Sequence, residues 1–168
     1  MVFPPRTAQE VAEAMAVYEP LGLPGAVGST DCTHIAWGAC ATTSRINHTG
    51  KEKRPTRVYE VTVNRQRKVL WVSGGYPGSQ NDITVSGRDS FVRSVGKDPL
   101  FTNAVFDVYT TDACIPTPAR GAWLLVDNGY TKHRHMQRPI STPVGPVAKL
   151  WTAWMGTFRG EGSSKGRG

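Results

Sequence analysis

The chain has 168 residues, 39% of them hydrophobic and 20% charged, which fits one compact domain with a sizeable core. No apolar stretch is long enough to span a bilayer, and the N-terminus lacks the charged segment and apolar core of a signal peptide. Lysine and arginine outnumber aspartate and glutamate by 20 to 13, and this net charge of +7 favours a polyanionic partner such as nucleic acid.

The cysteines indicate a reducing environment. There are three, an odd number without a CxxC pair, which argues against a disulfide framework and against a zinc ribbon. We therefore expect a soluble intracellular protein, in the nucleus or the cytoplasm, with no membrane partner.

The first part of the chain predicts a helix, a strand and a loop. Thr7 and Glu10 form a capping box ahead of an apolar helical face, so we expect a helix over residues 8–18. A strand is expected over about 26–37. The polar segment that follows, residues 38–56, is rich in lysine and arginine and predicts a basic loop.

The middle of the chain predicts a hairpin and a helix. Residues 57–63 alternate between two faces, and residues 68–74 follow after a short polar connection, which is typical of an antiparallel hairpin. The turn sequence YPGSQND then leads into a helix expected over about 81–95, which either Ser79 or Asn81 would cap.

The last part predicts an insertion, a strand and a helix. Residues 97–120 are proline-rich with little periodicity, so we expect an irregular insertion there. Residues 121–127 predict a short buried strand, and residues 148–158 a helix. Three large apolar residues are expected on one side of that helix: Leu150, Trp151 and Trp154. The final segment, 160–168, has the composition of a disordered tail.

This order of elements predicts an α/β domain with a mixed sheet and flanking helices, in which the late strand lies beside the first one. A parallel pairing of those strands would bring Asp31 and Asp127 together on one edge. Because side chains alternate along a strand, Cys32 and His34 would face the other way, and we expect them to serve packing.

Two neighbouring carboxylates repel each other, so they need hydrogen-bond donors, a shared proton or a bound cation. Oxygen ligands select Mg²⁺ or Mn²⁺, and such ions on a basic protein suggest phosphodiester chemistry. The alternative is that the two residues are unrelated, with Asp31 in a bulge and Asp127 capping the end of a strand.

Three segments, LPGAVGSTDCTH, YPGSQND and GAWLLVDNGY, resemble in order and spacing the Harbinger-type transposases and the DDE superfamily endonucleases derived from them. The resemblance covers about residues 21–159 and leaves an N-terminal helical segment, 1–20, outside. It implies a ribonuclease H-like fold whose acidic residues hold divalent metal for cutting and joining DNA. The family's two catalytic aspartates fall on Asp31 and Asp127, and an additional metal-associated aspartate falls on Asp82.

Asp82 and a second possible metal-binding group, the pair His133 and His135, have plain structural alternatives. An aspartate in the first turn of a helix, such as Asp82, is stabilised by the helix dipole without any metal. His133 and His135 form an HxH pair that is able to chelate metal, but basic residues flank them and no further ligand is evident, which favours a basic loop.

The basic loop is the candidate nucleic-acid-binding surface. Its cations form a solvated face or, beside a carboxylate site, neutralise DNA phosphates. The residues concerned are Arg45, Lys51, Lys53, Arg54 and Arg57. Weak binding without sequence preference is expected, and a separate DNA-binding protein would have to supply specificity.

The third catalytic acid of the family has no clear counterpart. The family places a glutamate four residues after an arginine, but four residues after Arg159 stands Ser163. Glu161 is only two residues on and lies among glycines, which disfavour a helix. We therefore expect an incomplete copy, truncated at the C-terminus, that cuts DNA poorly unless Glu161 reaches the site from the tail.

Two other functions compete with the nuclease. One is a catalytically inactive, transposase-derived domain that binds nucleic acid or protein. The other is a basic nucleic-acid-binding barrel with three aromatic side chains as stacking surfaces: Tyr59, Trp71 and Tyr76.

Overall fold

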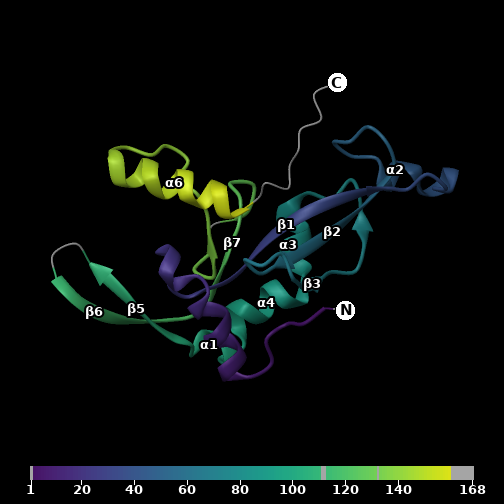
Figure 1. The fold of residues 1–168 in the computed structure, drawn as a ribbon. Helices are drawn as coiled ribbons and strands as arrows, with labels where there is room; N and C mark the ends of the chain where they lie inside the picture. Colours follow the sequence, from purple (N-terminus) through teal and green to yellow (C-terminus); the bar gives the residue numbers. More distant parts are fainter. Residues whose placement is uncertain (1, 111–112, 132, 160–168) are drawn as a thin grey trace.

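The computed structural model describes residues 2–110, 113–131 and 133–159 (Figure 1). Its α-helices are α1 (Ala8–Ala16), α2 (Arg45–His48), α3 (Asp82–Arg88), α4 (Ser90–Lys97), α5 (Pro99–Thr102) and α6 (Pro146–Arg159). Its strands are β1 (Ala26–Ala36), β2 (Thr56–Val63), β3 (Val69–Val72), β4 (Tyr76–Pro77), β5 (Val105–Thr110), β6 (Ala113–Arg120), β7 (Trp123–Leu125) and β8 (Met136–Gln137).

The main sheet is mixed and has the strand order β3-β2-β1-β7-β8, with β4 paired to β2. Strands β1, β2 and β3 are antiparallel neighbours, whereas β1, β7 and β8 run parallel. The hairpin and the parallel placement of the late strand beside the first are thus confirmed. The mixed sheet with flanking helices is consistent with a ribonuclease H-like arrangement, and it excludes the barrel.

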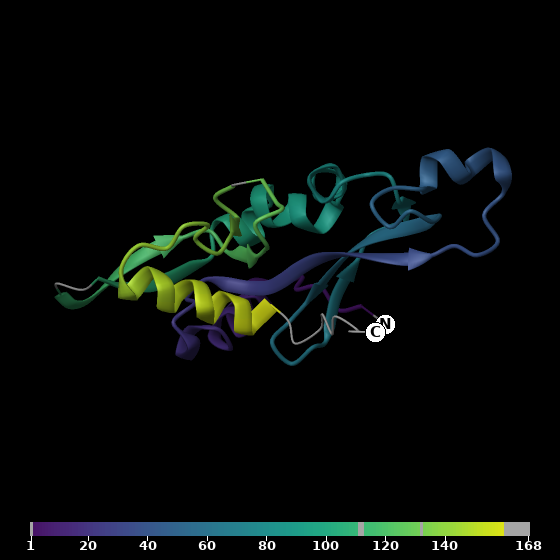
Figure 2. The ribbon, with the colours of Figure 1, turned by 90° about the horizontal axis from the view of Figure 1, so that it is seen from above.

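Helices cover both faces of this sheet. In Figure 2, α6 lies on one side of β1, and α3 and α4 lie on the other. One buried cluster joins α1, α4 and α5 to the sheet through residues that include Val11, Val92, Phe101 and Leu124. A second cluster joins the opposite face to α6 through residues that include Tyr18, Leu125 and Met155. The sheet therefore forms the central layer of the domain.

The N-terminal helix has the predicted cap. The Thr7 hydroxyl accepts a hydrogen bond from the Glu10 backbone N–H, and the Glu10 side chain accepts one from the Thr7 backbone N–H. The helix ends at Ala16, two residues before the expected boundary. Its buried residues Val11 and Met15 hold it against the core.

The helix expected over 81–95 is in fact two helices, α3 and α4. Asn81 caps the first, as predicted, by accepting the Thr84 backbone N–H. The break lies at Asp89, whose extended backbone lets its carboxylate accept the Val92 N–H at 2.8 Å and the Trp71 indole N–H at 3.0 Å. This buried side chain caps α4, so a single straight helix is not formed.

The expectation of an irregular insertion over 97–120 is wrong. This segment contains α5 and the antiparallel pair β5–β6, which projects from the body at the end away from α2 (Figures 1 and 2). Pro116 and Pro118 obscure β6 in the sequence because proline disfavours central strands. Standing two residues apart, they direct their nitrogens to one edge, which a two-stranded ribbon tolerates.

Three further predictions concern the basic loop, the last helix and the C-terminal tail. The basic loop contains the short helix α2 and a 3-10 turn, Thr42–Ser44. Helix α6 starts at Pro146, a favoured first position, and buries Met155, whereas Leu150 is 60% exposed and not on the packed side. The predicted disordered tail lies outside the described residues. Within the described chain, no helix has the length and apolarity needed to cross a membrane.

Candidate metal centre

The parallel pairing of β1 with β7 ends just before the two predicted aspartates. The last pair in this parallel ladder is Ser29 with Leu125. Asp31 and Asp127 each follow two residues later, so continuing the register sets them side by side. Because side chains repeat every two residues, both lie on the face of Leu125, which packs with α6.

Backbone donors orient both carboxylates. The Asp31 Oδ1 atom accepts the Cys32 N–H at 2.9 Å, and the Asp127 Oδ1 atom accepts the Gly129 N–H at 2.7 Å. A β-carbon on Gly129 would lie only 2.9 Å from that Asp127 oxygen. A larger residue at this position would therefore displace the Asp127 carboxylate.

Asp82, the first residue of α3, approaches the same turn. Its Oδ2 atom lies 3.7 Å from the position that a Gly129 β-carbon would take, so it neighbours Asp127. That oxygen also faces Lys51 Nζ at 3.8 Å. Its Oδ1 atom is buried and has no hydrogen-bond partner in the described part of the protein. A buried acceptor without a donor is the feature that a cation would satisfy.

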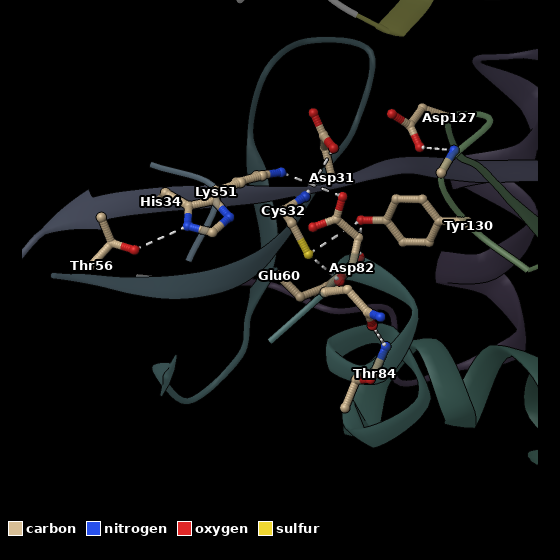
Figure 3. A network of polar contacts seen from close by, with 12 residues as sticks. Asp31, Cys32, His34, Lys51, Thr56, Glu60, Asp82, Thr84, Asp127 and Tyr130 are labelled. Carbon is tan, nitrogen blue, oxygen red and sulfur yellow. Dashed lines mark hydrogen bonds and ion pairs between the residues drawn. The ribbon is translucent and has the colours of Figure 1, made fainter. Parts of the chain in front are cut away.

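Figure 3 shows the three aspartates around one edge of the sheet, carried by three different elements. Their oxygen atoms suit Mg²⁺ or Mn²⁺, so the residue types fit such an ion. Across the described residues, however, no three or more His, Cys, Asp or Glu side chains form a group that could hold a metal ion. Asp82 and Asp127 are neighbours at the Gly129 turn, but the three aspartates are not a complete set of ligands.

The buried carboxyl group of Glu60 lies beneath this edge. Glu60 is 0% exposed on β2, where the sequence suggests an ordinary surface acid beside the basic loop. Its Oε1 atom accepts the Thr30 hydroxyl at 2.6 Å and the Tyr130 hydroxyl at 2.9 Å, and its Oε2 atom accepts the Cys32 thiol at 3.1 Å. Only its place between Val58 and Thr62, on the inward face of an alternating strand, could have indicated burial.

Burial also changes the acidity of this network. Loss of solvation raises the pKa of Glu60, although its hydrogen bonds act in the opposite direction. Desolvation likewise raises the pKa of the Cys32 thiol and of the Tyr130 hydroxyl, and the nearby Glu60 adds to both effects. The thiol and the phenol therefore remain protonated donors at neutral pH. Cys32 packs inward, as expected.

All five predicted nucleic-acid-binding side chains are exposed: Arg45, Lys51, Lys53, Arg54 and Arg57. Arg57 lies on β2 and the other four lie in the basic loop, which is attached to the segment before α3, where Ser79 donates its hydroxyl to the Asn47 carbonyl at 2.6 Å. The Lys51–Asp82 contact brings one loop cation to the aspartates. The basic surface therefore borders the region of Asp31, Asp82 and Asp127, which we call the acidic edge.

The family comparison agrees with this geometry. Residues 3–161 match the model of a family described as plant transposon protein. The chain belongs to the plant transposon protein family. The matched range includes the three aspartates, Glu60 and the basic loop. The chain matches no curated protein and no solved structure.

The remaining candidates from the sequence are the HxH pair, the aromatic residue Trp71 and the third acid. In this transposon protein, the His133 and His135 rings are stacked with centroids 5.4 Å apart, and burial lowers the pKa of His135. Trp71 is a packing residue, stacked on Phe91 at 6.1 Å, rather than a surface for bases. Glu161, the candidate third acid, and Ser163 lie outside the described residues.

Proposed function

We propose that the chain is a divalent-metal-dependent endonuclease domain of the DDE, Harbinger-type class, acting on DNA phosphodiesters. The observation that carries the proposal is the parallel pairing of β1 with β7, which ends at Ser29 and Leu125, two residues before Asp31 and Asp127. Membership of a transposon family and the adjoining basic loop support it.

In this proposal, Asp31 and Asp127 bind Mg²⁺ or Mn²⁺ directly, and Asp82 contributes from α3. When bound, a pair of such ions would activate the attacking oxygen and stabilise the leaving one. The Cys32 and Gly129 amides hold the two carboxylates in place through hydrogen bonds. Lys51 balances the charge of Asp82.

Binding of DNA is assigned to the basic loop. Its exposed cations neutralise backbone phosphates and position the strand at the acidic edge, without reading bases. A separate DNA-binding protein would then supply sequence specificity. In this reading the basic loop provides affinity, and the aspartates provide the chemistry.

The decisive experiment measures thermal stability during titration with Mn²⁺. A ligand that binds the folded state stabilises it by about 2.7 kcal/mol at 100 times its Kd, so the melting temperature should rise. Asp31→Asn and Asp127→Asn should abolish this rise. Asp107→Asn is the matched control, because Asp107 is exposed on β5. An undiminished rise in both site variants would refute the proposal.

Activity is tested separately by nicking of supercoiled plasmid with Mn²⁺. We expect little cleavage, because the family's third acid has no counterpart at the expected spacing. Efficient cleavage that is lost in Glu161→Gln would instead assign the third acid to Glu161. Efficient cleavage that persists in Glu161→Gln would show that another residue takes this role.

A second candidate function is a catalytically inactive, transposase-derived domain that binds nucleic acid or a protein. The lack, within the described part of the chain, of a group of three metal-binding side chains favours it. The two functions differ in one measurement. An inactive binding domain would retain DNA affinity but show no stabilisation by Mn²⁺ that depends on Asp31 and Asp127.

A further inference from the structure

We propose that Glu60 is a positioning residue, whose buried carboxyl group fixes Asp31 and Asp127 relative to each other. The inference rests on the proposed metal centre, but it concerns a residue, Glu60, that none of the sequence motifs includes. Glu60 lies on β2, whereas the two aspartates lie on β1 and directly after β7.

On the β1 side, the Glu60 carboxyl group binds both neighbours of Asp31. Thr30 donates to Oε1 at 2.6 Å and Cys32 donates to Oε2 at 3.1 Å. Adjacent side chains on a strand point to opposite faces. Holding Thr30 and Cys32 on the inner face therefore holds Asp31 on the outer one.

On the β7 side, the same carboxyl group holds the turn that carries Asp127. The Tyr130 hydroxyl donates to Oε1 at 2.9 Å, and the Tyr130 backbone N–H contacts the Asp127 carbonyl at 3.3 Å. Arg138 donates to the Tyr130 carbonyl at 3.0 Å. One carboxyl group thus joins the strand of Asp31 to the turn of Asp127 (Figure 3).

Stability alone is a poor explanation for this arrangement. A buried carboxyl group loses its hydration, and well-packed apolar residues of similar volume are often equally stable or more so. What apolar residues lack is directionality, because hydrogen bonds constrain both distance and angle. A network with three donors from two segments is suited to fixing geometry.

The test compares Tyr130→Phe with Ser73→Ala by calorimetric titration with Mn²⁺. The first variant removes the hydroxyl that reaches Glu60 from the Asp127 turn. The second removes the Ser73 hydroxyl, which accepts the Glu60 backbone N–H at 2.8 Å. It therefore removes a buried partner of Glu60 but leaves the hydrogen bonds of the Glu60 carboxyl group intact. Loss of an outer partner costs about 10–100-fold in metal affinity, so we expect at least a tenfold higher Kd for Tyr130→Phe. Ser73→Ala should stay within about twofold of wild type.

Equal affinities in these two variants would overturn the inference while leaving the metal centre intact. A wild-type chain that binds no Mn²⁺ would overturn the metal centre and the inference together. Should Tyr130→Phe fail to fold, Glu60→Gln and Glu60→Met decide. Glutamine keeps an oxygen acceptor and should retain affinity, whereas methionine keeps only the volume and should lose it. Similar affinity in both would contradict the role of Glu60.

Discussion

The protonation of Glu60 links the stability of this domain to pH. Burial raises its folded-state pKa above the ordinary value of 4.5. Below pH 4.5 both states are protonated. Between pH 4.5 and the folded-state pKa, the unfolded chain has released this proton while the folded chain still holds it. The contribution of Glu60 to the free energy of unfolding therefore falls as pH rises through this range. The titratable groups that act on it are Cys32, Tyr130 and Asp89.

Glu60→Gln should therefore gain stability relative to wild type as pH rises. The wild-type carboxyl group titrates over this range and the glutamine does not, so the free energy of unfolding of wild type should fall relative to that of Glu60→Gln between pH 4 and pH 7. Urea denaturation at pH 4 and pH 7 measures it, and Glu52→Gln, on the exposed loop, is the control. A Glu60→Gln effect that is identical at both pH values would show that Glu60 ionises equally in both states.

Gly78 has no room for a β-carbon, whereas Gly87 has. A β-carbon on Gly78 would collide with Thr56 and lie 2.6 Å from the His48 carbonyl oxygen. Gly78→Ala should therefore destabilise the fold by about 1–3 kcal/mol. Gly87→Ala, inside α3 with nothing within 4 Å, should instead stabilise it by about 0.4–1 kcal/mol. Chemical denaturation compares them, and effects of the same sign would contradict this assignment.

Among the site residues, the sequence predicts those that obey strand alternation and strand order. The expected proximity of Asp31 and Asp127 follows from the order of the strands, and the parallel pairing of β1 with β7 that it assumes is observed as far as Ser29 and Leu125. Glu60 was not predicted to be buried, because in sequence it is one acid within a basic stretch. Its burial depends on donors from Thr30 and Tyr130, which are distant in the chain.

At the scale of elements, the caps of α1 and α4 differ in burial. Asp89 is 1% exposed and satisfies two donors, whereas the capping residue Thr7 is exposed. Thr7→Ala should cost about 1 kcal/mol. Asp89→Ala should cost about 2–4 kcal/mol, because it removes both a buried helix cap and the acceptor of the Trp71 indole N–H. Equal losses in urea denaturation would show that burial of the cap is irrelevant.

The same elements show where sequence patterns stop being informative. The capping box of α1 acts within four residues, so the sequence alone predicts it. The break between α3 and α4 depends on Trp71, which donates to Asp89 from the distant strand β3. Strands β5 and β6 stabilise each other by antiparallel pairing, so neither was predicted from its own sequence. Local signals were therefore predictable, and those that need a tertiary partner were not.

At the scale of the whole molecule, the proposed function requires the acidic edge and the basic loop to act on the same DNA. The loop lies at the end of the domain away from the β5–β6 hairpin (Figure 1). Lys51, Lys53 and Arg54 are all exposed, but the Lys51 ammonium group already faces the Asp82 carboxylate. We therefore expect Lys53 and Arg54 to be the better phosphate contacts.

Salt dependence of DNA binding tests this division of charge. Each phosphate neutralised contributes about 0.9 to the slope of log K against log salt, so Lys53→Gln with Arg54→Gln should lower the slope by about 2. The matched control is Arg93→Gln with Lys97→Gln, which removes the same charge from the exposed surface of α4. Fluorescence anisotropy on two unrelated duplexes should give similar, weak affinities, since no reading helix enters a groove in this proposal. Should the α4 variant lower the slope as much as the loop variant, net charge rather than the loop would govern binding, and the path of DNA across the acidic edge would have to be abandoned.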